Sequence, residues 1–139
     1  MTASSVKQSY HNHTRLSDGR CSLQDHINAA REYGLEELGI SDHYTLHPSE
    51  IVEWSMPLDG LEDYVRELTE TAAALTDLSL RVGVEADFFP ETTGDLRERL
   101  ANLPFDYIIG SVHYVDGFPV DEHTRFWDAL SISERDDIH

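Results

Sequence analysis

The feature of this 139-residue sequence that most restricts its fold is an alternation of strand-like and helix-like segments. Short apolar runs rich in β-branched residues are separated by longer stretches whose apolar residues recur at helical spacing. We expect strands over 5–11, 35–40, 78–89 and 105–113, and helices over 22–33, 61–75 and 96–103. Strands that alternate with helices are typical of parallel βαβ units, so the sequence predicts an α/β fold.

Local signals strengthen two of these assignments. Ser22 and Asp25 have the spacing of a capping box, and Gly34 follows the last periodic residue, so both ends of one helix are marked. The segment 105–113 is the strongest strand, and it is apolar enough to be buried on both faces. Ser131 is expected to cap a further helix.

Two stretches lack a sustained period, and we expect long loops there. These are 44–59, which contains two prolines, and 114–124. The length of the chain predicts a single domain over 1–139.

The net charge of −17 argues against nucleic acid and against an anionic membrane surface as partners. Cys21 is the only cysteine, which excludes an intrachain disulfide, and no apolar run is long enough to cross a bilayer. The N-terminus lacks the apolar core of a signal peptide, and together these features predict a cytoplasmic location.

Residue types that bind metals follow the predicted strands. These residues are His11 and His13, His43, Glu85 and His113, and Asp18 follows in the loop after the first pair. Functional side chains of α/β barrels lie at the carboxyl ends of the parallel strands, so we expect these residues to converge. Imidazole and carboxylate ligands without thiolates suit Zn²⁺, Mn²⁺ or Fe²⁺.

Such a site predicts metal-assisted hydrolysis of a phosphate ester. The site would hold two to three divalent ions. Glu85 could bridge two of them, and a hydroxide shared by these ions would attack phosphorus in line. Asp42 is expected to orient His43 or a neighbouring ligand rather than to bind metal itself. Arg15 could reach a substrate phosphate or could lie on the surface, and Asp87 could be a site residue or a solvated acid.

Four motifs resemble those of the polymerase and histidinol phosphatase (PHP) superfamily, and they occur in the family's order. They are His11-Asn12-His13-Thr14 with Ser17-Asp18-Gly19, Gly39-Ile40-Ser41-Asp42-His43, Gly83-Val84-Glu85, and Gly110-Ser111-Val112-His113. The run from Phe105 to Gly117, with the acidic segment after it, is most similar to the histidinol-phosphatase branch.

The resemblance implies a distorted (β/α)₇ barrel with a trinuclear metal site. It implies that the first ion is bound by His11, His13 and Glu85, the second by Glu85 and His113, and the third by Asp18 and His43. On this basis, catalytic roles are expected for Glu85, His113 and Asp18.

In the family, the remaining metal ligands and the basic residues that bind the substrate phosphate come from the later part of the barrel. This sequence lacks those motifs. We therefore expect about the first four βα units, an incomplete barrel. The implied activity is hydrolysis of a small phosphorylated substrate, with L-histidinol phosphate in histidine biosynthesis as the first hypothesis. The alternatives are a phosphoesterase for another phosphate ester, and a non-catalytic metal-binding half-barrel that associates with itself or with a complementing chain.

Overall fold

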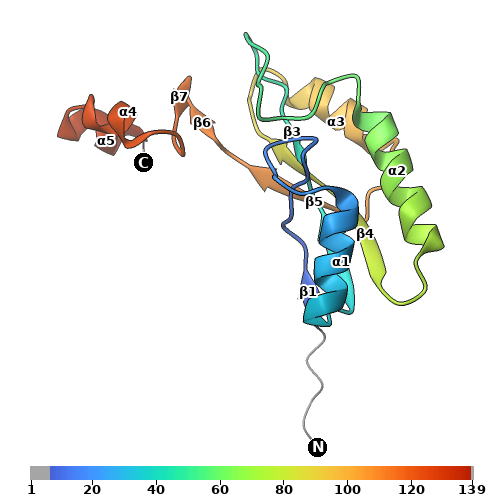
Figure 1. Cartoon of the computed structure of the whole chain (residues 1–139). Coiled ribbons are helices and arrows are strands. Elements are labelled where there is room, and N and C mark those ends of the chain that lie inside the picture. The colour runs from blue at the N-terminus through green and yellow to red at the C-terminus, as the bar shows by residue number, and fades with distance from the viewer. Residues whose placement is uncertain (1–6, 139) are drawn as a thin grey trace, which may run out of the picture.

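The computed structural model describes residues 7–138, and its centre is a parallel sheet with helices packed against it (Figure 1). The elements are β1 (Gln8–Ser9), α1 (Leu23–Tyr33), β2 (Glu37–Ile40), β3 (His43–Tyr44), α2 (Leu61–Ala74), β4 (Ser79–Asp87), α3 (Thr93–Ala101), β5 (Tyr107–Ser111), β6 (Tyr114–Val115), β7 (Phe118–Pro119), α4 (Thr124–Asp128) and α5 (Ile132–Ile138). The predicted α/β alternation is confirmed. Residues 5 and 6 of the first predicted strand lie outside the described residues.

Strand pairing follows the order of the chain. β1 pairs with β2, both β2 and β3 pair with β4, and β5 pairs with the other edge of β4, all in parallel. Glu37 lies opposite Ser79, and His43 lies opposite Glu85, so β2 and β3 keep a single register along β4. They are therefore two pieces of one strand.

A tyrosine hydroxyl occupies the break between these two pieces. Tyr64 of α2 is buried, accepts a hydrogen bond from the Asp42 amide at 3.1 Å and donates to the Gly83 carbonyl at 2.7 Å. Burial raises the pKa of the Tyr64 phenol far above its usual value, which keeps the hydroxyl protonated as a donor. The hydroxyl thus satisfies backbone groups that the broken strand leaves unpaired.

The hydrophobic core lies between the sheet and helices α1, α2 and α3. Every second strand residue points into it, including Leu38 and Ile40 of β2 with Leu80, Val82 and Val84 of β4. The helices contribute residues such as Ile27, Val65 and Leu96 from their apolar stripes. The expected capping box of α1 is confirmed, and Gly34 ends that helix with a φ of 66°.

On the opposite face of the sheet, the ring of Tyr107 packs on two glycines. A Cβ atom on Gly39 would lie 2.2 Å from the Tyr107 hydroxyl, and one on Gly83 would lie 2.2 Å from Cζ of the same ring. The Tyr107 hydroxyl donates to the Tyr10 carbonyl at 2.5 Å. Glycine is needed at both positions because the ring packs directly on the backbone.

The prediction that 105–113 is buried on both faces is wrong. Residues of β5 alternate between partly buried and exposed, and Ile108 is 51% exposed. Within the described residues β5 pairs only with β4. Ile108 lies opposite the core residue Val84, so it points to the side where helices cover the other strands. The structure therefore leaves some apolar side chains of this segment exposed that the sequence predicts to be buried.

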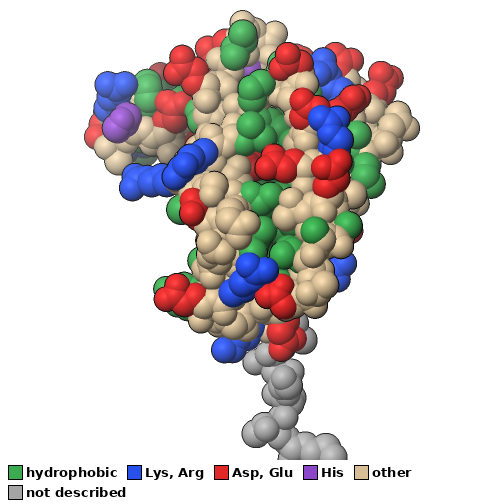
Figure 2. Space-filling view, turned by 45° about the vertical axis from the view of Figure 1, so that its right-hand side comes forward, with side chains coloured by type: hydrophobic (Ala, Val, Ile, Leu, Met, Phe, Trp, Pro, Cys, Tyr) green, Lys and Arg blue, Asp and Glu red, His purple; other side chains and the backbone are tan. Residues whose placement is uncertain are grey.

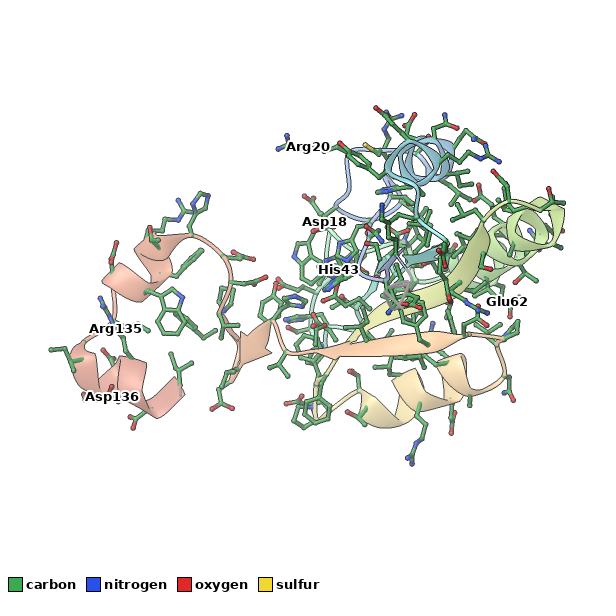
Figure 3. The ribbon with its side chains drawn as sticks, turned by 90° about the horizontal axis from the view of Figure 1, so that it is seen from below. Asp18, Arg20, His43, Glu62, Arg135 and Asp136 are labelled. Carbon is green, nitrogen blue, oxygen red and sulfur yellow. The ribbon has the colours of Figure 1, made fainter. Side chains whose placement is uncertain are left out.

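The expected loop over 114–124 is also partly wrong. Tyr114 pairs with Pro119 in a short antiparallel hairpin, turned by Asp116 and Gly117 with positive φ angles, and α4 begins at Thr124. The hairpin and the two last helices form an arm that extends to one side of the sheet (Figures 1 and 3). Neither α4 nor α5 has a buried residue.

On the face that Figure 2 shows, acidic side chains are spread over the surface between arginines and do not gather in one patch.

None of the helices within residues 7–138 has the length and the apolar character that a bilayer span requires.

Candidate metal centre

Strand register brings two of the predicted residues together. His43 lies directly opposite Glu85 in the β3–β4 pairing, so the two side chains emerge next to each other. Both residues are at least 95% buried. Parallel pairing is what aligns these strand ends, and the sequence prediction rested on the same rule.

A tight loop brings Asp18 back to His13. Backbone hydrogen bonds from Arg15 to Cys21 and from Gly19 to Thr14 close this loop. A Cβ atom on Gly19 would lie 2.0 Å from the His13 carbonyl oxygen, so a larger residue would push the loop open. The Asp18 carboxylate then lies 2.7 Å from His13 Nδ1 and 3.3 Å from His43 Nε2.

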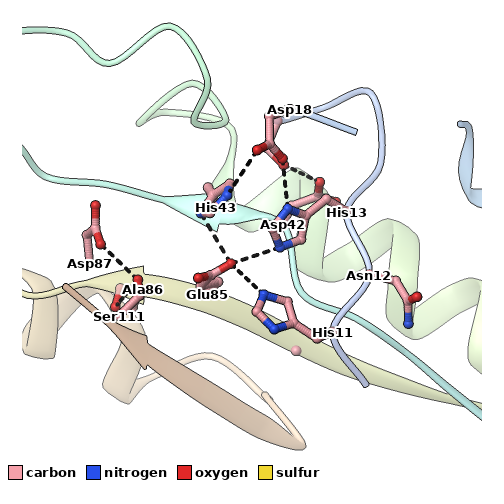
Figure 4. A network of polar contacts seen from close by, with 12 residues as sticks. His11, Asn12, His13, Asp18, Asp42, His43, Glu85, Ala86, Asp87 and Ser111 are labelled. Carbon is pink, nitrogen blue, oxygen red and sulfur yellow. Dashed lines mark hydrogen bonds and ion pairs between the residues drawn. The ribbon is translucent and has the colours of Figure 1, made fainter. Parts of the chain in front are cut away.

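Glu85 is at the centre of the cluster. Its Oε2 atom lies 2.9 Å from His11 Nε2, 2.8 Å from His13 Nε2 and 3.3 Å from His43 Nδ1 (Figure 4). Its Oε1 atom is 3.7 Å from His113 Nε2. One carboxylate therefore faces four imidazoles that come from three separate parts of the chain.

Three overlapping groups of side chains could each hold a metal ion. In each group the ligand atoms lie within 4.8 Å of one another, and the groups are His11, His13 and Glu85; His13, Asp18 and His43; and His43, Glu85 and His113. All six residues predicted as ligands therefore meet in one place. Shared members let neighbouring ions use a common bridging side chain.

Two buried nitrogens in this cluster fit a bound cation. His13 Nε2 and His43 Nδ1 have no hydrogen-bond partner among the described residues, although each lies within 3.3 Å of Glu85 Oε2. The atoms are close, but they are not aligned as donor and acceptor. Buried nitrogens without a hydrogen-bond partner can instead bind a metal ion, and His and carboxylate donors suit a divalent one.

The local electrostatics favour the protonation states that bind metals. Burial lowers the pKa of His43 below its usual value, which favours the neutral imidazole. Burial alone would raise the pKa of Glu85, but the His11 hydrogen bond and the surrounding histidines hold it below its usual value. A neutral imidazole and an ionised carboxylate are the ligating forms of these side chains.

Asp42 supports the loop rather than His43. Its fully buried carboxylate accepts hydrogen bonds from the Thr14 amide at 2.7 Å, the Thr14 hydroxyl at 2.8 Å and the Ser17 hydroxyl at 2.5 Å. These contacts fix the loop that carries His13 and Asp18. The expectation of an orienting role stays a prediction, and the structure directs it to those two neighbours.

Arg15 lies at the edge of the same loop. Its Nε donates to the Arg20 carbonyl at 2.8 Å, and a terminal nitrogen is 3.9 Å from Asp25. The side chain is 67% exposed and contacts the start of α1 rather than the histidine cluster. The proposed contact with a phosphate would require this side chain to turn.

Three further residues lie next to the cluster, and the sequence predicted a definite site role for none of them. Trp54 packs edge-on against the rings of His43 and His113, with centroids 4.8 and 5.2 Å apart. Asp121 places Oδ2 3.6 Å from His113 Nε2, and Asp87, whose role was left open, is buried and bonded to His113. Trp54 and Asp121 lie in segments without periodicity, so no sequence signal placed them here.

Known proteins match this sequence over most of its length. The PHP domain family matches residues 9–137. A protein of Deinococcus radiodurans named "Probable histidinol-phosphatase" is 32% identical over 99 residues, which cover 70% of this chain and 38% of that protein. The "Histidinol-phosphatase" of Lactococcus lactis is 26% identical over 124 residues, covering 87% of this chain and 44% of that protein.

Solved structures share the fold. A crystal structure of histidinol phosphate phosphatase from Lactococcus lactis, complexed with zinc, L-histidinol and phosphate, matches with a TM-score of 0.70 and 23% identity over 82% of this chain and 43% of that one. A histidinol phosphatase from Listeria monocytogenes, described as putative, matches with a TM-score of 0.76 and 18% identity over 88% and 52%. The sheet with its helices therefore corresponds to about half of a PHP barrel.

The chain spans less than half the length of these curated relatives. The family match covers more than nine-tenths of this sequence, and the four motifs quoted above fall within it. This chain belongs to the PHP domain family.

Proposed function

We propose that this chain carries the first part of a metal-dependent phosphomonoesterase site, with L-histidinol phosphate as the substrate. The observation that carries the proposal is the position of Glu85 Oε2, within 3.3 Å of nitrogens on His11, His13 and His43. A buried carboxylate among imidazoles would bridge two ions. Relatives named "Probable histidinol-phosphatase" and "Histidinol-phosphatase" support the choice of substrate.

The residues would divide the work by position. His11 and His13 would hold one ion with Glu85, His113 a second with Glu85, and Asp18 and His43 a third, so that two to three ions are fixed by packed strand ends. Divalent ions such as zinc, manganese or iron, when bound, would withdraw charge from the phosphate oxygens and acidify a water. The buried side chains would hold this geometry without rearrangement as negative charge develops.

The test combines metal analysis with a phosphatase assay on the 139-residue chain. We expect two or more equivalents of divalent metal and release of phosphate from L-histidinol phosphate. Glu85→Gln should lower both while leaving the fold intact, because the amide keeps the shape and loses the bridging charge. Glu98→Gln, on the exposed side of α3, makes the same charge change away from the site and should leave both unchanged.

Two outcomes would contradict the proposal. Full turnover by the Glu85→Gln variant would exclude the bridging role. Fewer than two bound ions together with no turnover by the parent chain would exclude the activity for this chain.

A second candidate is a metal-binding half-barrel that becomes active only with a complementing chain or copy. The observation in its favour is coverage, since this chain spans 38–44% of the two curated relatives. It predicts bound metal without turnover, and recovery of turnover on addition of the missing strands.

A further inference from the structure

A buried carboxylate, that of Asp87, lies next to the cluster and has no part in the proposed function. Asp87 ends β4 two residues after Glu85, so both side chains point to the same face of the sheet. It is only 1% exposed. A carboxylate in such a position needs partners, because burying an unpaired charge is strongly unfavourable.

The partners of Asp87 come from the end of β5. Strand register places Ser111 opposite Asp87, and the Ser111 hydroxyl donates to Asp87 Oδ1 at 2.8 Å (Figure 4). His113 follows two residues later and brings Nδ1 to 2.5 Å from the same oxygen. The second oxygen, Oδ2, is buried without a hydrogen-bond partner among residues 7–138.

The two nitrogens of His113 face different groups. Nδ1 faces Asp87, whereas Nε2 lies 3.7 Å from Glu85 Oε1 and 3.6 Å from Asp121 Oδ2. An ionised carboxylate can only accept, so Nδ1 must carry the proton in that hydrogen bond. A neutral imidazole has one proton, and Nε2 then keeps its lone pair directed at the cluster.

We propose that Asp87 is the positioning residue for His113: it selects the Nδ1–H tautomer and orients the ring so that Nε2 can bind metal. The inference rests on the proposed metal site, but not on the identity of the substrate. Asp87 acts through His113, because its recorded side-chain contacts are with His113 and Ser111. Trp54, packed edge-on at 5.2 Å, limits rotation of the same ring.

A purely structural role for Asp87 accounts less well for these contacts. Stability alone would favour full satisfaction of a buried carboxylate or its replacement by an apolar residue. Instead, Oδ1 accepts two hydrogen bonds while Oδ2 has none among the described residues. A carboxylate that accepts the second ring N–H of a metal-binding histidine fixes the tautomer and orientation of that ring, and its loss weakens metal binding by about 10- to 100-fold.

The first measurement uses the unaltered, metal-free chain. Long-range ¹H–¹⁵N correlation at about pH 8 reports which nitrogen of His113 is protonated, and a His113→Gln variant assigns the signals. We expect the Nδ1–H tautomer. Protonation on Nε2 would overturn the proposal.

The second measurement compares Asp87→Asn with Ser111→Ala. The Asn variant keeps the size of the side chain but loses the charge, and we expect a loss of the Nδ1–H preference and Zn²⁺ affinity lower by about 10-fold or more at the weakened site. Ser111→Ala removes the other hydrogen bond to Oδ1 and should change affinity by less than about 2-fold. Unchanged tautomer and affinity in Asp87→Asn would overturn the proposal.

These readouts separate this inference from the proposed function. Failure to hydrolyse L-histidinol phosphate would contradict the substrate assignment while leaving the His113 tautomer and the zinc titration as they are. Conversely, wild-type zinc affinity in Asp87→Asn would remove the positioning role whether or not the chain has phosphatase activity.

Discussion

Replacing Tyr64 with phenylalanine tests whether its hydroxyl holds the interrupted strand. The ring would keep its place in the core, but the amide of Asp42 and the carbonyl of Gly83 would each lose a hydrogen bond. Leaving a buried polar group unsatisfied costs about 1–3 kcal/mol. We therefore expect Tyr64→Phe to lower the free energy of unfolding by about 2–3 kcal/mol. In a domain of this size, such a loss lowers Tm by about 6–10 °C.

Tyr44→Phe is the matched control. Tyr44 is also fully buried, and its hydroxyl also makes two hydrogen bonds, donating to Leu58 and accepting from Arg99. Leu58 is 38% exposed and Arg99 lies on the exposed side of α3, so water can replace the lost contacts. This variant should lose about 0.5–1 kcal/mol.

Urea unfolding in the presence of EDTA gives both values without a contribution from bound metal. The m-value should stay constant if each variant changes stability alone. A loss from Tyr64→Phe no larger than that from Tyr44→Phe would refute the reasoning, because it would mean that the two backbone groups find other partners.

Three further results are expected. Zinc at about 100 times its Kd should raise the free energy of unfolding in urea by about 2.7 kcal/mol, and EDTA should reverse this gain. An unchanged free energy of unfolding would contradict a folded metal site. Gly83→Ala should lower the free energy of unfolding by more than about 1 kcal/mol, because its Cβ would meet the Tyr107 ring. Gly94→Ala, on an open helix surface, should be neutral or stabilising. Equal effects of the two substitutions would contradict the packing of Tyr107 on Gly83. The exposed edge of β5, with Ile108 and Val112, should make the chain self-associate, so a monodisperse monomer in light scattering at 100 µM would count against this prediction.

The convergence of the predicted ligands could be foreseen from the sequence because it depends on simple rules. Parallel strands end at a common edge, and residues two apart share a face, so His43, Glu85 and His113 had to lie near one another once the strands were identified. The short loop after His13 likewise indicated that Asp18 would lie near the first pair of histidines.

Other parts of the site depend on contacts that periodicity does not encode. Tyr64 fits the apolar stripe of its helix, but the partners of its hydroxyl depend on how that helix crosses the strand break. Asp87 could be read as a solvated acid until the register of β5 placed Ser111 and His113 beside it. The predicted burial of β5 depended on neighbours that the described residues do not provide.

The contact between Tyr107 and Tyr10 has a consequence for the order of assembly. The two residues are 97 positions apart, so a chain emerging from the ribosome cannot form this hydrogen bond until its fifth strand has been synthesised. Until then, the backbone at Gly39 and Gly83 lacks its aromatic cover. Tyr10 directly precedes His11, so the first histidine of the cluster is held by a contact between residues 97 positions apart, and a non-local contact of this kind is slow to close. The group of His43, Glu85 and His113 should therefore be completed only after the fifth strand has docked.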